Sequence, residues 1–490
     1  MGAKLRVAGW VALGTVAGAL ATMSYQATAR SSGSQLPLEE LNQLASVFSM
    51  VKNTYVDPVD EKKLINDAIA GMVNGLDPHS AYLEKQNFTE FKESTTGKFV
   101  GVGIEIQMEE GLVKVATPIE GSPAFKAGLK SGDLITKIDD TPVKGLTMDQ
   151  AVKRMRGQSG TKVVLNIFRK TENRVFPVTI TREEIKVQSI VAKVIEPGYG
   201  WIRIRQFQER SVEDFSRKLD DLYKADPNLK GLVLDLRNDP GGLLDGAIAV
   251  SAAFLPTDVT VVSTNGQVHD AKQVFKTVPS DYLRRPGIDD PVRRLPAAVK
   301  SVPLVVLVNE GSASASEIVA GALQDHHRAT IMGAQTFGKA SVQTFTCLAG
   351  RYSIEDCPGR GLKLTTARYY TPNGNSIQAK GIVPDVMLDE TAEGNVFSAL
   401  RTREADLDKH LASGQGAEVK DLAREKAREE ARKKLEDELA KNANAAPKPL
   451  PEFGSPEDFQ LNQALNRLKG RPVLASKTIV ERKAEATTTN

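Results

Sequence analysis

Apolar side chains recur along this chain with two periods, and each period predicts a different element. Residues 36–95 carry helical spacing in two stripes, Leu41 to Val51 and Leu64 to Val73. Short apolar, β-branched runs such as Leu232 to Leu236 and Pro303 to Val308 are typical of buried strands. The two helical stripes need a partner, which is either the rest of the chain or a second subunit.

A turn and a helix are predicted directly after Val308. Asn309 to Gly311 has residues typical of a turn. Apolar positions at three- and four-residue spacing then occur between Ile318 and Leu323. Three serines stand at the start of this helix: Ser312, Ser314 and Ser316. A serine at such a corner exposes its hydroxyl near free backbone N–H groups that can bind an oxyanion. Helix capping accounts for the same serines, and spacing alone does not choose among them.

Lys339 adds a base to these serines. The segment Ala340 to Thr346 is β-branched and aromatic, which predicts a strand in which Lys339, Ser341 and Gln343 share a face. A lysine acts as a general base only when neutral, and lowering its pKa from about 10.4 toward 7 costs about 4 kcal/mol. Burial supplies that penalty, and an amide such as Gln343 can orient the amine without adding charge. The pattern favours a serine protease that uses lysine as its base.

Four motifs extend this pattern along the chain. They are G-S-A-S-A-S-E-I-V-A-G-A-L-Q-D after Glu310, T-F-G-K-A-S-V-Q ending at Gln343, L-K-L-T-T-A-R-Y-Y-T-P-N-G at Leu362 to Gly374, and K-G-I-V-P-D-V at Lys380 to Val386. Together they resemble the carboxyl-terminal processing peptidases, also called tail-specific proteases, over most of residues 40–390. The resemblance implies an α/β fold of the α+β multidomain kind. It would have a crotonase- or Clp-protease-like α/β catalytic core, an inserted PDZ domain and helical N- and C-terminal segments.

The resemblance also implies roles for individual residues. It implies that Ser314 is the nucleophile, that Lys339 is the general base, and that Gln343 is the third member of the triad. Ala315, which follows the nucleophile, is expected to supply one N–H of an oxyanion hole. The second N–H comes from L-V-L-D-L-R-N-D-P-G-G, where Gly241 and Gly242 let the backbone approach a substrate. A tight turn without a ligand is the alternative for this loop, and the choice between the two glycines stays open.

A second region, Phe99 to about Glu184, resembles a PDZ domain. It contains F-V-G-V-G-I-E-I and, at Pro123 to Asp133, P-A-F-K-A-G-L-K-S-G-D. PDZ domains bind a peptide carboxyl terminus as an added strand. The expected tail-binding residues are Phe99, Val100, Gly101, Val102, Gly103, Ile104 and Ile106. Arg156 is a candidate for coupling the two domains, with an ordinary solvated arginine as the alternative.

These features predict a serine endopeptidase that docks the apolar carboxyl-terminal tail of a protein substrate on its PDZ domain. A silent PDZ adaptor would not need the serine, lysine and glutamine together. A chymotrypsin-like protease would place His and Asp before Ser and the PDZ domain last. His326 and His327 beside Asp325 cannot form the relay of a Ser-His-Asp triad, because adjacent helical residues point in different directions. These histidines are expected to be exposed at the helix end.

The first thirty residues indicate export. Lys4 and Arg6 precede the apolar stretch Val7 to Met23, and Ala27 to Ala29 forms an A-x-A site. The stretch is longer than a cleaved core of about 7–15 residues and shorter than a spanning helix of about 20, so cleavage and anchoring in the inner membrane both stay open. We expect an exported, periplasmic protein.

The two cysteines fit such a compartment. Cys347 and Cys357 flank a loop between the segment of Gln343 and the one that begins at Leu362. An oxidising compartment favours a disulfide between them, with two free thiols as the alternative.

Charge and composition exclude some classes of function. A net charge of +3 on 490 residues is too small and too evenly mixed to imply a nucleic-acid partner. No H-E-x-x-H or paired C-x-x-C occurs, so neither a metal nor another cofactor is expected. The expected partners are protein or peptide substrates, further copies of this chain, and an adaptor or activator protein.

The carboxyl end differs from the rest. Asp421 to Lys441 is densely charged and predicts an exposed helix, Asn442 to Pro456 a linker, and Asp458 to Leu468 a short amphipathic piece. A solvated extension is the expectation, with docking of the last piece on a subunit or adaptor as the alternative. The predicted domains are signal or anchor 1–30, helical region 36–95, PDZ domain 96–185, catalytic domain 186–392, and extension with disordered tail 393–490.

Overall fold

The structure is a computed structural model of the chain. It describes residues 36–476 except 110, 286, 288, 355, 395–398, 416–421 and 442–450. The predicted export signal, most of the predicted linker and the predicted disordered tail lie outside the described residues. Among the described helices, none has both the length and the apolar character to cross a bilayer. The chain divides into two compact units, one ending at Met72 and one beginning at Val73.

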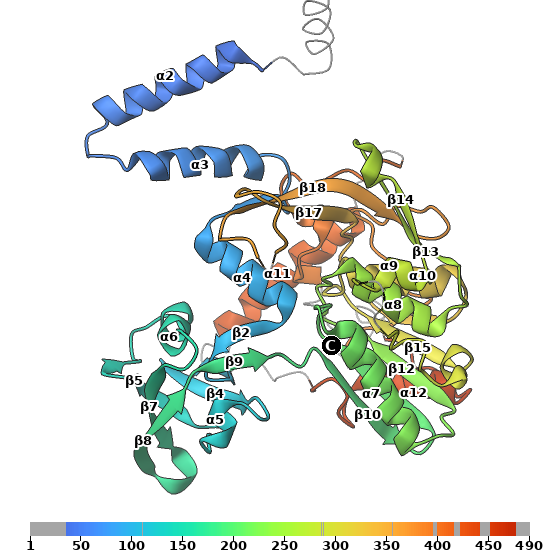
Figure 1. The fold of residues 1–490 in the computed structure, drawn as a ribbon. Helices are drawn as coiled ribbons and strands as arrows, with labels where there is room; N and C mark the ends of the chain where they lie inside the picture. The colour runs from blue at the N-terminus through green and yellow to red at the C-terminus, as the bar shows by residue number, and fades with distance from the viewer. Residues whose placement is uncertain are drawn as a thin grey trace, which may run out of the picture. The chain divides into compact units, whose positions relative to one another are not determined.

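Two amphipathic helices, drawn in blue in Figure 1, form the described part of the first unit, and the second of them continues two residues past Met72. α2 spans Leu38–Thr54 and α3 spans Glu61–Asn74. They form over the two apolar stripes in the sequence. No residue of α2 is buried, and Leu44 and Val47 on its stripe are 49% and 51% exposed. The stripe of α2 is therefore an open apolar surface.

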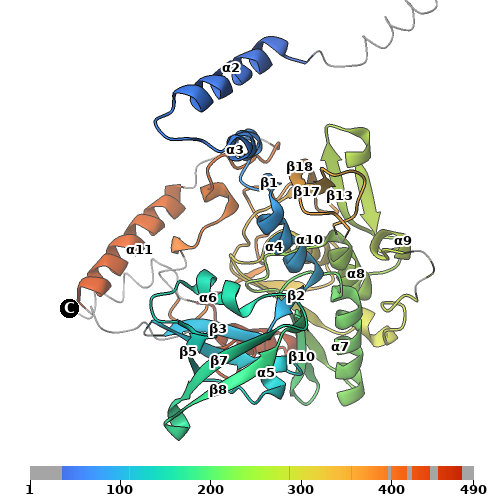
Figure 2. The same cartoon turned by 60° about the vertical axis from the view of Figure 1, so that its left-hand side comes forward.

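An antiparallel sheet forms the PDZ region of the second unit (Figure 2). Its order is β3-β4-β5-β7-β8, with β6 beside β5. The strands are β3 (Ile104–Glu109), β4 (Leu112–Pro118), β5 (Leu134–Ile138), β6 (Thr141–Pro142), β7 (Lys162–Arg169) and β8 (Arg174–Thr181). Alternating apolar positions pack with helices α5 (Pro123–Lys126) and α6 (Met148–Met155) into one core. β2 (Lys98–Gly101) pairs with β9 (Glu183–Lys186) outside this sheet. β3 is an edge strand of the sheet.

A mostly parallel sheet forms the centre of the catalytic region (Figure 1). Its order is β10-β11-β12-β15-β16-β19, parallel from β11 onward, with β10 antiparallel at one edge. The strands are β10 (Ile190–Glu196), β11 (Tyr199–Ile204), β12 (Gly231–Asp235), β15 (Leu304–Val308), β16 (Thr330–Gly333) and β19 (Val386–Met387). Every residue of β12 and β15 is buried, which explains their unbroken apolar runs.

Helices cover both faces of this sheet. α7 (Ser211–Ala225), α8 (Leu244–Phe254) and α10 (Ala315–Asp325) contribute to the large core on one face. α12 (Phe459–Leu468) packs on the other face, where Leu461 and Leu465 are 1% and 5% exposed. The expectation of a solvated extension is therefore wrong for α12, because its apolar stripe fills the second face of the chain's own sheet. The charged helix before it, α11, spans Leu422–Lys441.

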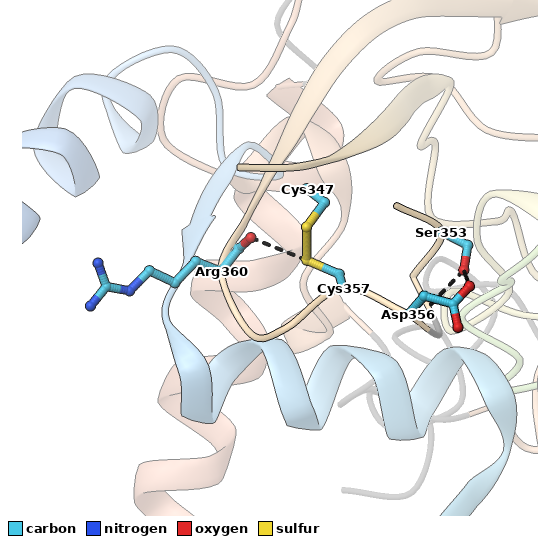
Figure 3. The surroundings of a disulfide bond; sticks show 5 residues. All are labelled: Cys347, Ser353, Asp356, Cys357 and Arg360. Carbon is cyan, nitrogen blue, oxygen red and sulfur yellow. Dashed lines mark hydrogen bonds between the residues drawn. A yellow bond between two sulfur atoms is a disulfide. The ribbon is translucent and has the colours of Figure 1, made fainter. Parts of the chain in front are cut away.

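A second, antiparallel sheet contains the strand that carries Gln343. Its order is β1-β18-β13-β14, and β17 pairs with β18. The strands are β1 (Ala81–Leu83), β13 (Thr260–Gly266), β14 (Gln273–Lys276), β17 (Ser341–Cys347) and β18 (Gly361–Tyr370). Two short helices, α4 (Lys85–Thr96) and α9 (Pro279–Tyr282), complete the region. A disulfide joins Cys347 to Cys357 where β17 ends (Figure 3), and it packs with Leu83 and Phe88.

Candidate active site

Ser314 lies at the corner between β15 and α10. It is the N-cap of α10, with φ 56° and ψ −112°, a conformation that residues other than glycine rarely adopt. Its backbone N–H donates to Oε2 of Glu317 at 2.9 Å. A strained backbone of this kind persists only where neighbouring groups hold it, and such strain is concentrated at functional sites.

The two neighbouring serines have different surroundings. Ser312 and Ser316 are completely buried, whereas Ser314 is partly exposed. The Ser312 hydroxyl donates to the carbonyl of Leu236 at 2.8 Å, and the Ser316 hydroxyl donates to the carbonyl of Asp239 at 3.0 Å. Both hydroxyls thus tie the corner to the end of β12. The structure therefore separates three serines that spacing left equivalent.

Lys339 lies next to Ser314, although not in the way the sequence predicted. β17 begins at Ser341, so Lys339 lies in the preceding loop and strand alternation does not orient it. The Lys339 backbone N–H donates at 2.9 Å to Oε2 of Glu317, the same oxygen that accepts from Ser314. The Tyr369 hydroxyl contacts the carbonyl oxygens of both residues. A carboxylate and a phenol thus hold the two backbones side by side.

Glu317 is the residue that the sequence reasoning missed. It is completely buried, and Oε1 accepts from the Gly338 N–H at 2.7 Å and the Thr336 hydroxyl at 2.5 Å. Burial raises its pKa to about 7 against the lowering effect of these donors. Glu317 stands three residues after an N-cap serine, which is the spacing of a capping box. That spacing was the signal available in the sequence.

The surroundings of Lys339 favour its neutral form. Desolvation lowers the pKa of Lys339 to about 8, and the positive charge of Lys363 acts in the same direction. The carboxylates of Glu404, Glu317 and Asp77 act in the opposite direction. Burial prevails, so about a tenth of Lys339 is uncharged at pH 7, far more than for a lysine with the ordinary pKa of about 10.4.

Gln343 lies on β17 and shares a face with Ser341. Its Nε2 donates to the Ser341 hydroxyl at 3.0 Å and to the Thr365 hydroxyl at 3.1 Å. The Thr365 hydroxyl donates in turn to Asp77 at 3.1 Å. These bonds fix the orientation of the amide on β17.

The glycine turn after β12 touches the corner between β15 and α10 that carries Ser314. Gly241 has φ 91°, and a Cβ placed there would lie 2.5 Å from the Ala313 carbonyl and 2.7 Å from the Ala315 amide nitrogen. Gly242 has φ 142°, and its Cβ would lie 2.0 Å from the carbonyl of Phe207. Only glycine fits at either position. The Gly241 N–H donates to Asp239 Oδ1 at 2.9 Å, whereas Ala315 is the first residue of α10.

The residues considered for a histidine mechanism have other roles. Asp325 Oδ2 accepts from the Asn373 backbone N–H at 2.8 Å, and His326 Nε2 lies 2.7 Å from the Thr260 carbonyl. His327 is exposed as expected, but His326 is half-buried because its ring packs toward β13. Within the described ranges, no cluster of His, Cys, Asp or Glu is arranged to hold a metal ion.

The predicted tail-binding residues divide between two strands and a turn. Phe99 to Gly101 are paired in β2, so the expected turn is reduced to Val102 and Gly103. Gly103 has φ 79°, and a Cβ there would lie 2.3 Å from Ser122 Cβ. Ile104 and Ile106 lie on edge strand β3 and pack partly against the PDZ core.

Arg156 is not an ordinary solvated arginine. Its guanidinium forms an ion pair with Glu93 of α4 and lies 5.5 Å from the centre of the Phe99 ring. It therefore joins the end of α6 to the segment that leads into β2.

The chain is similar to known proteases over most of its length. Residues 198–388 match the model of peptidase family S41, residues 100–180 match the PDZ domain, and residues 8–87 match the activating protease CtpB N-terminal domain. A carboxy-terminal-processing protease of Bartonella bacilliformis is 43% identical over 354 residues, covering 72% of this chain and 76% of that protein. A probable CtpA-like serine protease of Staphylococcus aureus is 38% identical over 71% of this chain and 65% of that protein. Among solved structures, a photosystem II D1 C-terminal processing protease is 28% identical, with 71% and 93% of the two chains covered and a TM-score of 0.39.

Proposed function

The chain belongs to the carboxy-terminal-processing proteases of peptidase family S41 and is a serine-type peptidase with a PDZ domain, and from this premise we propose a serine–lysine mechanism. Ser314 attacks the scissile carbonyl, and neutral Lys339 accepts the hydroxyl proton as general base. Lys339 then protonates the leaving amine. The observation that carries the proposal is the Glu317 oxygen that accepts from both backbone amides. Gln343 completes the proposed triad, and the two hydrogen bonds of its Nε2 hold its amide in one orientation.

The proposed oxyanion hole combines Ala315 with the glycine turn. The N–H groups in the first turn of a helix have no acceptor within that helix, which makes the Ala315 amide a suitable donor. Gly241 already donates to Asp239, and this favours Gly242 as the second donor. The close approach of this turn to Ala315 supports the pairing.

The PDZ domain is proposed to read the substrate's free carboxyl terminus. An extended tail adds to the open edge of β3, the turn at Val102 and Gly103 binds the terminal carboxylate through backbone N–H groups, and Ile104 and Ile106 contact apolar tail residues. The position of β3 at the sheet edge supports this mode. No cofactor takes part in the proposed reaction.

Two further parts of the proposal concern assembly and location. The open apolar stripe of α2 fits association of further copies of this chain, with an adaptor or activator protein as a second partner class. We propose export to a periplasmic compartment, with the amino-terminal segment either cleaved or retained as an inner-membrane anchor. The disulfide between Cys347 and Cys357 supports an oxidising compartment.

Cleavage of tailed substrates tests the catalytic proposal. An unfolded substrate with an apolar free carboxyl terminus is incubated with the full chain and with Ser314→Ala and Lys339→Ala, and compared with the same substrate amidated at its end. We expect the wild type to cut the free-carboxylate substrate preferentially and both variants to cut neither. A variant that still cuts contradicts its catalytic role. A wild type that binds the tail without cutting would instead favour the silent-adaptor alternative.

A further inference from the structure

Arg237 is a buried charge at the end of β12, enclosed by side chains from distant parts of the chain. It is 1% exposed. Its Nε and Nη2 donate to the two oxygens of Asp235 at 2.9 and 2.6 Å. Nη1 and Nη2 donate to the two oxygens of Asp458 at 2.9 and 2.7 Å, and Nη1 also donates to Gln460 at 3.0 Å. Asp458 is thus a bidentate partner of a buried guanidinium, contributed by the C-terminal segment.

Asp458 is itself held in place. It is the N-cap of α12, and its carboxylate accepts from the backbone N–H groups of Leu461 and Gly454 at 3.1 and 2.8 Å. The ring of Phe453 lies 4.0 Å from the Arg237 guanidinium. Because Leu461, in the first turn of α12, packs on the sheet, this carboxylate has a rigid support.

Arg237 is connected in turn to the nucleophile corner. Its side chain contacts Asp458 and Gln460, while backbone carbonyls on either side of it accept hydrogen bonds from the corner that carries Ser314. The carbonyl of Leu236 accepts from the Ser312 hydroxyl at 2.8 Å. The carbonyl of Asp239 accepts from the Ala313 N–H at 3.0 Å and from the Ser316 hydroxyl at 3.0 Å. A shift of Arg237 would therefore move residues 238–242 against that corner.

We propose that Asp458 is a positioning residue for the active site. By fixing Arg237 it fixes the turn that carries Gly241 and Gly242, so the C-terminal segment 453–461 is part of the catalytic apparatus rather than an appendage. The inference rests on the proposed function in so far as this turn supplies an oxyanion donor. It goes beyond that function in placing a requirement for catalysis after residue 450.

The test compares Asp458→Asn with Leu465→Ala in the full chain. The asparagine keeps the shape and one acceptor but removes the charge that faces Arg237. Leu465→Ala removes buried volume from the same helix without touching Arg237. We expect Asp458→Asn to lower kcat about 10- to 100-fold, less than the roughly 100- to 1,000-fold for deletion of one oxyanion donor, with KM within about twofold. Leu465→Ala should lower Tm and leave kcat unchanged well below the melting temperature.

Hydrogen exchange of residues 236–243 gives a readout independent of turnover. Faster exchange there in Asp458→Asn, but not in Leu465→Ala, supports the inference even if the wild type cleaves nothing and the proposed function fails. Unchanged kcat and exchange in folded Asp458→Asn overturn it, as does an equal kcat loss in both variants at equal Tm. If Asp458→Asn does not fold, Gln460→Ala removes a neutral acceptor from the same guanidinium. A smaller change of the same kind, at least twofold in kcat, is then expected, and its absence overturns the inference.

Discussion

The PDZ site and the catalytic site are built from the chain in opposite ways. The proposed tail-binding residues come from one stretch, Phe99 to Ile106, which continues into an antiparallel sheet of mostly neighbouring strands. The proposed catalytic site joins segments around Asp77, Asp239, Ser314 and Lys339 with residues of β18. A site made by local pairing can be read from one motif. A site made by distant contacts depends on buried polar groups that the motif does not name.

Glu317 illustrates the difference. In the PDZ site, backbone groups of the turn and edge strand are the proposed ligands for the tail. In the proposed catalytic site, the buried carboxylate of Glu317 accepts from four donors on two segments. Burying a carboxylate costs free energy unless its oxygens accept hydrogen bonds. The donors around Glu317 therefore hold their positions together, and losing one of them disturbs the others.

Removing the proposed nucleophile or base should lower kcat/KM more than any other change. The loss should be the same whether or not the substrate has a free carboxyl-terminal tail. Ser314→Ala and Lys339→Ala are expected to lower kcat/KM about 10,000-fold or more for free-tail and amidated substrates alike, because both act on the chemical step. Quenched-peptide assays measure this loss. A residual rate that still discriminates between the two substrates would contradict a common catalytic site.

Glu317→Gln should separate positioning from chemistry. The amide presents an NH₂ group to donors that now meet a carboxylate, so the loop of Lys339 shifts and kcat should fall about 100-fold. Glu310→Gln is the matched control, since Glu310 is a nearby glutamate, in the turn between β15 and α10, but pairs with Arg401. Kinetics and Tm are measured for both variants. Equal kcat values in the two variants would contradict the proposal that Glu317 holds Ser314 and Lys339 together.

The pH dependence of kcat/KM should follow the ionisation of Lys339. Because Lys339 is active only when neutral and its pKa is lowered to about 8, kcat/KM should rise about tenfold per pH unit up to about pH 8. Burial raises the pKa of Asp239 to about 8, so its ionisation places a negative charge beside the oxyanion turn and should depress activity above that pH. Asp239→Asn should extend the alkaline plateau. A rising limb centred near pH 6 would indicate a histidine base instead.

A change in the PDZ pocket should have a moderate effect limited to tailed substrates. Ile106→Asp places a charge among apolar contacts and is expected to raise KM about tenfold for the free-tail substrate, with little effect on the amidated one. Gln107→Asp, on the opposite and exposed face of β3, is the control and should change neither. An equal change for both substrates would mean that the PDZ domain acts on the catalytic site rather than on the tail.

The disulfide should contribute to stability and not to catalysis. Its cysteines are 10 residues apart, and opening a loop of that size should lower the free energy of unfolding by about 3 kcal/mol. Urea unfolding of Cys347→Ser, and of the wild type with and without a thiol reductant, measures this difference. A fall in kcat at 25 °C on reduction would show instead that the loop supports Gln343.

Part of the site followed from the sequence and part did not. The resemblance to carboxyl-terminal processing peptidases is confirmed by the family to which the chain belongs, as are the α/β fold class and the PDZ domain. Contiguous motifs carried these conclusions. The expected strand position of Lys339 was wrong, because β17 starts only at Ser341 and hydrogen bonds to Glu317 orient the preceding loop. Glu317 and Tyr369 were missed, since nothing local relates them to a lysine more than twenty residues away.

The sequence by itself determined where helices and strands form and which residues belong to the family's motifs. The reason is that helical and strand periods are properties of the local backbone. Only the tertiary structure decided which of three serines is partly exposed, what holds Lys339 beside it, and which apolar stripe finds a partner. The stripes of α2 and α12 look alike in the sequence, yet one is open and the other covers the catalytic sheet. An amphipathic pattern states that a face favours burial, whereas the surface that buries it is set by contacts between residues distant in the chain.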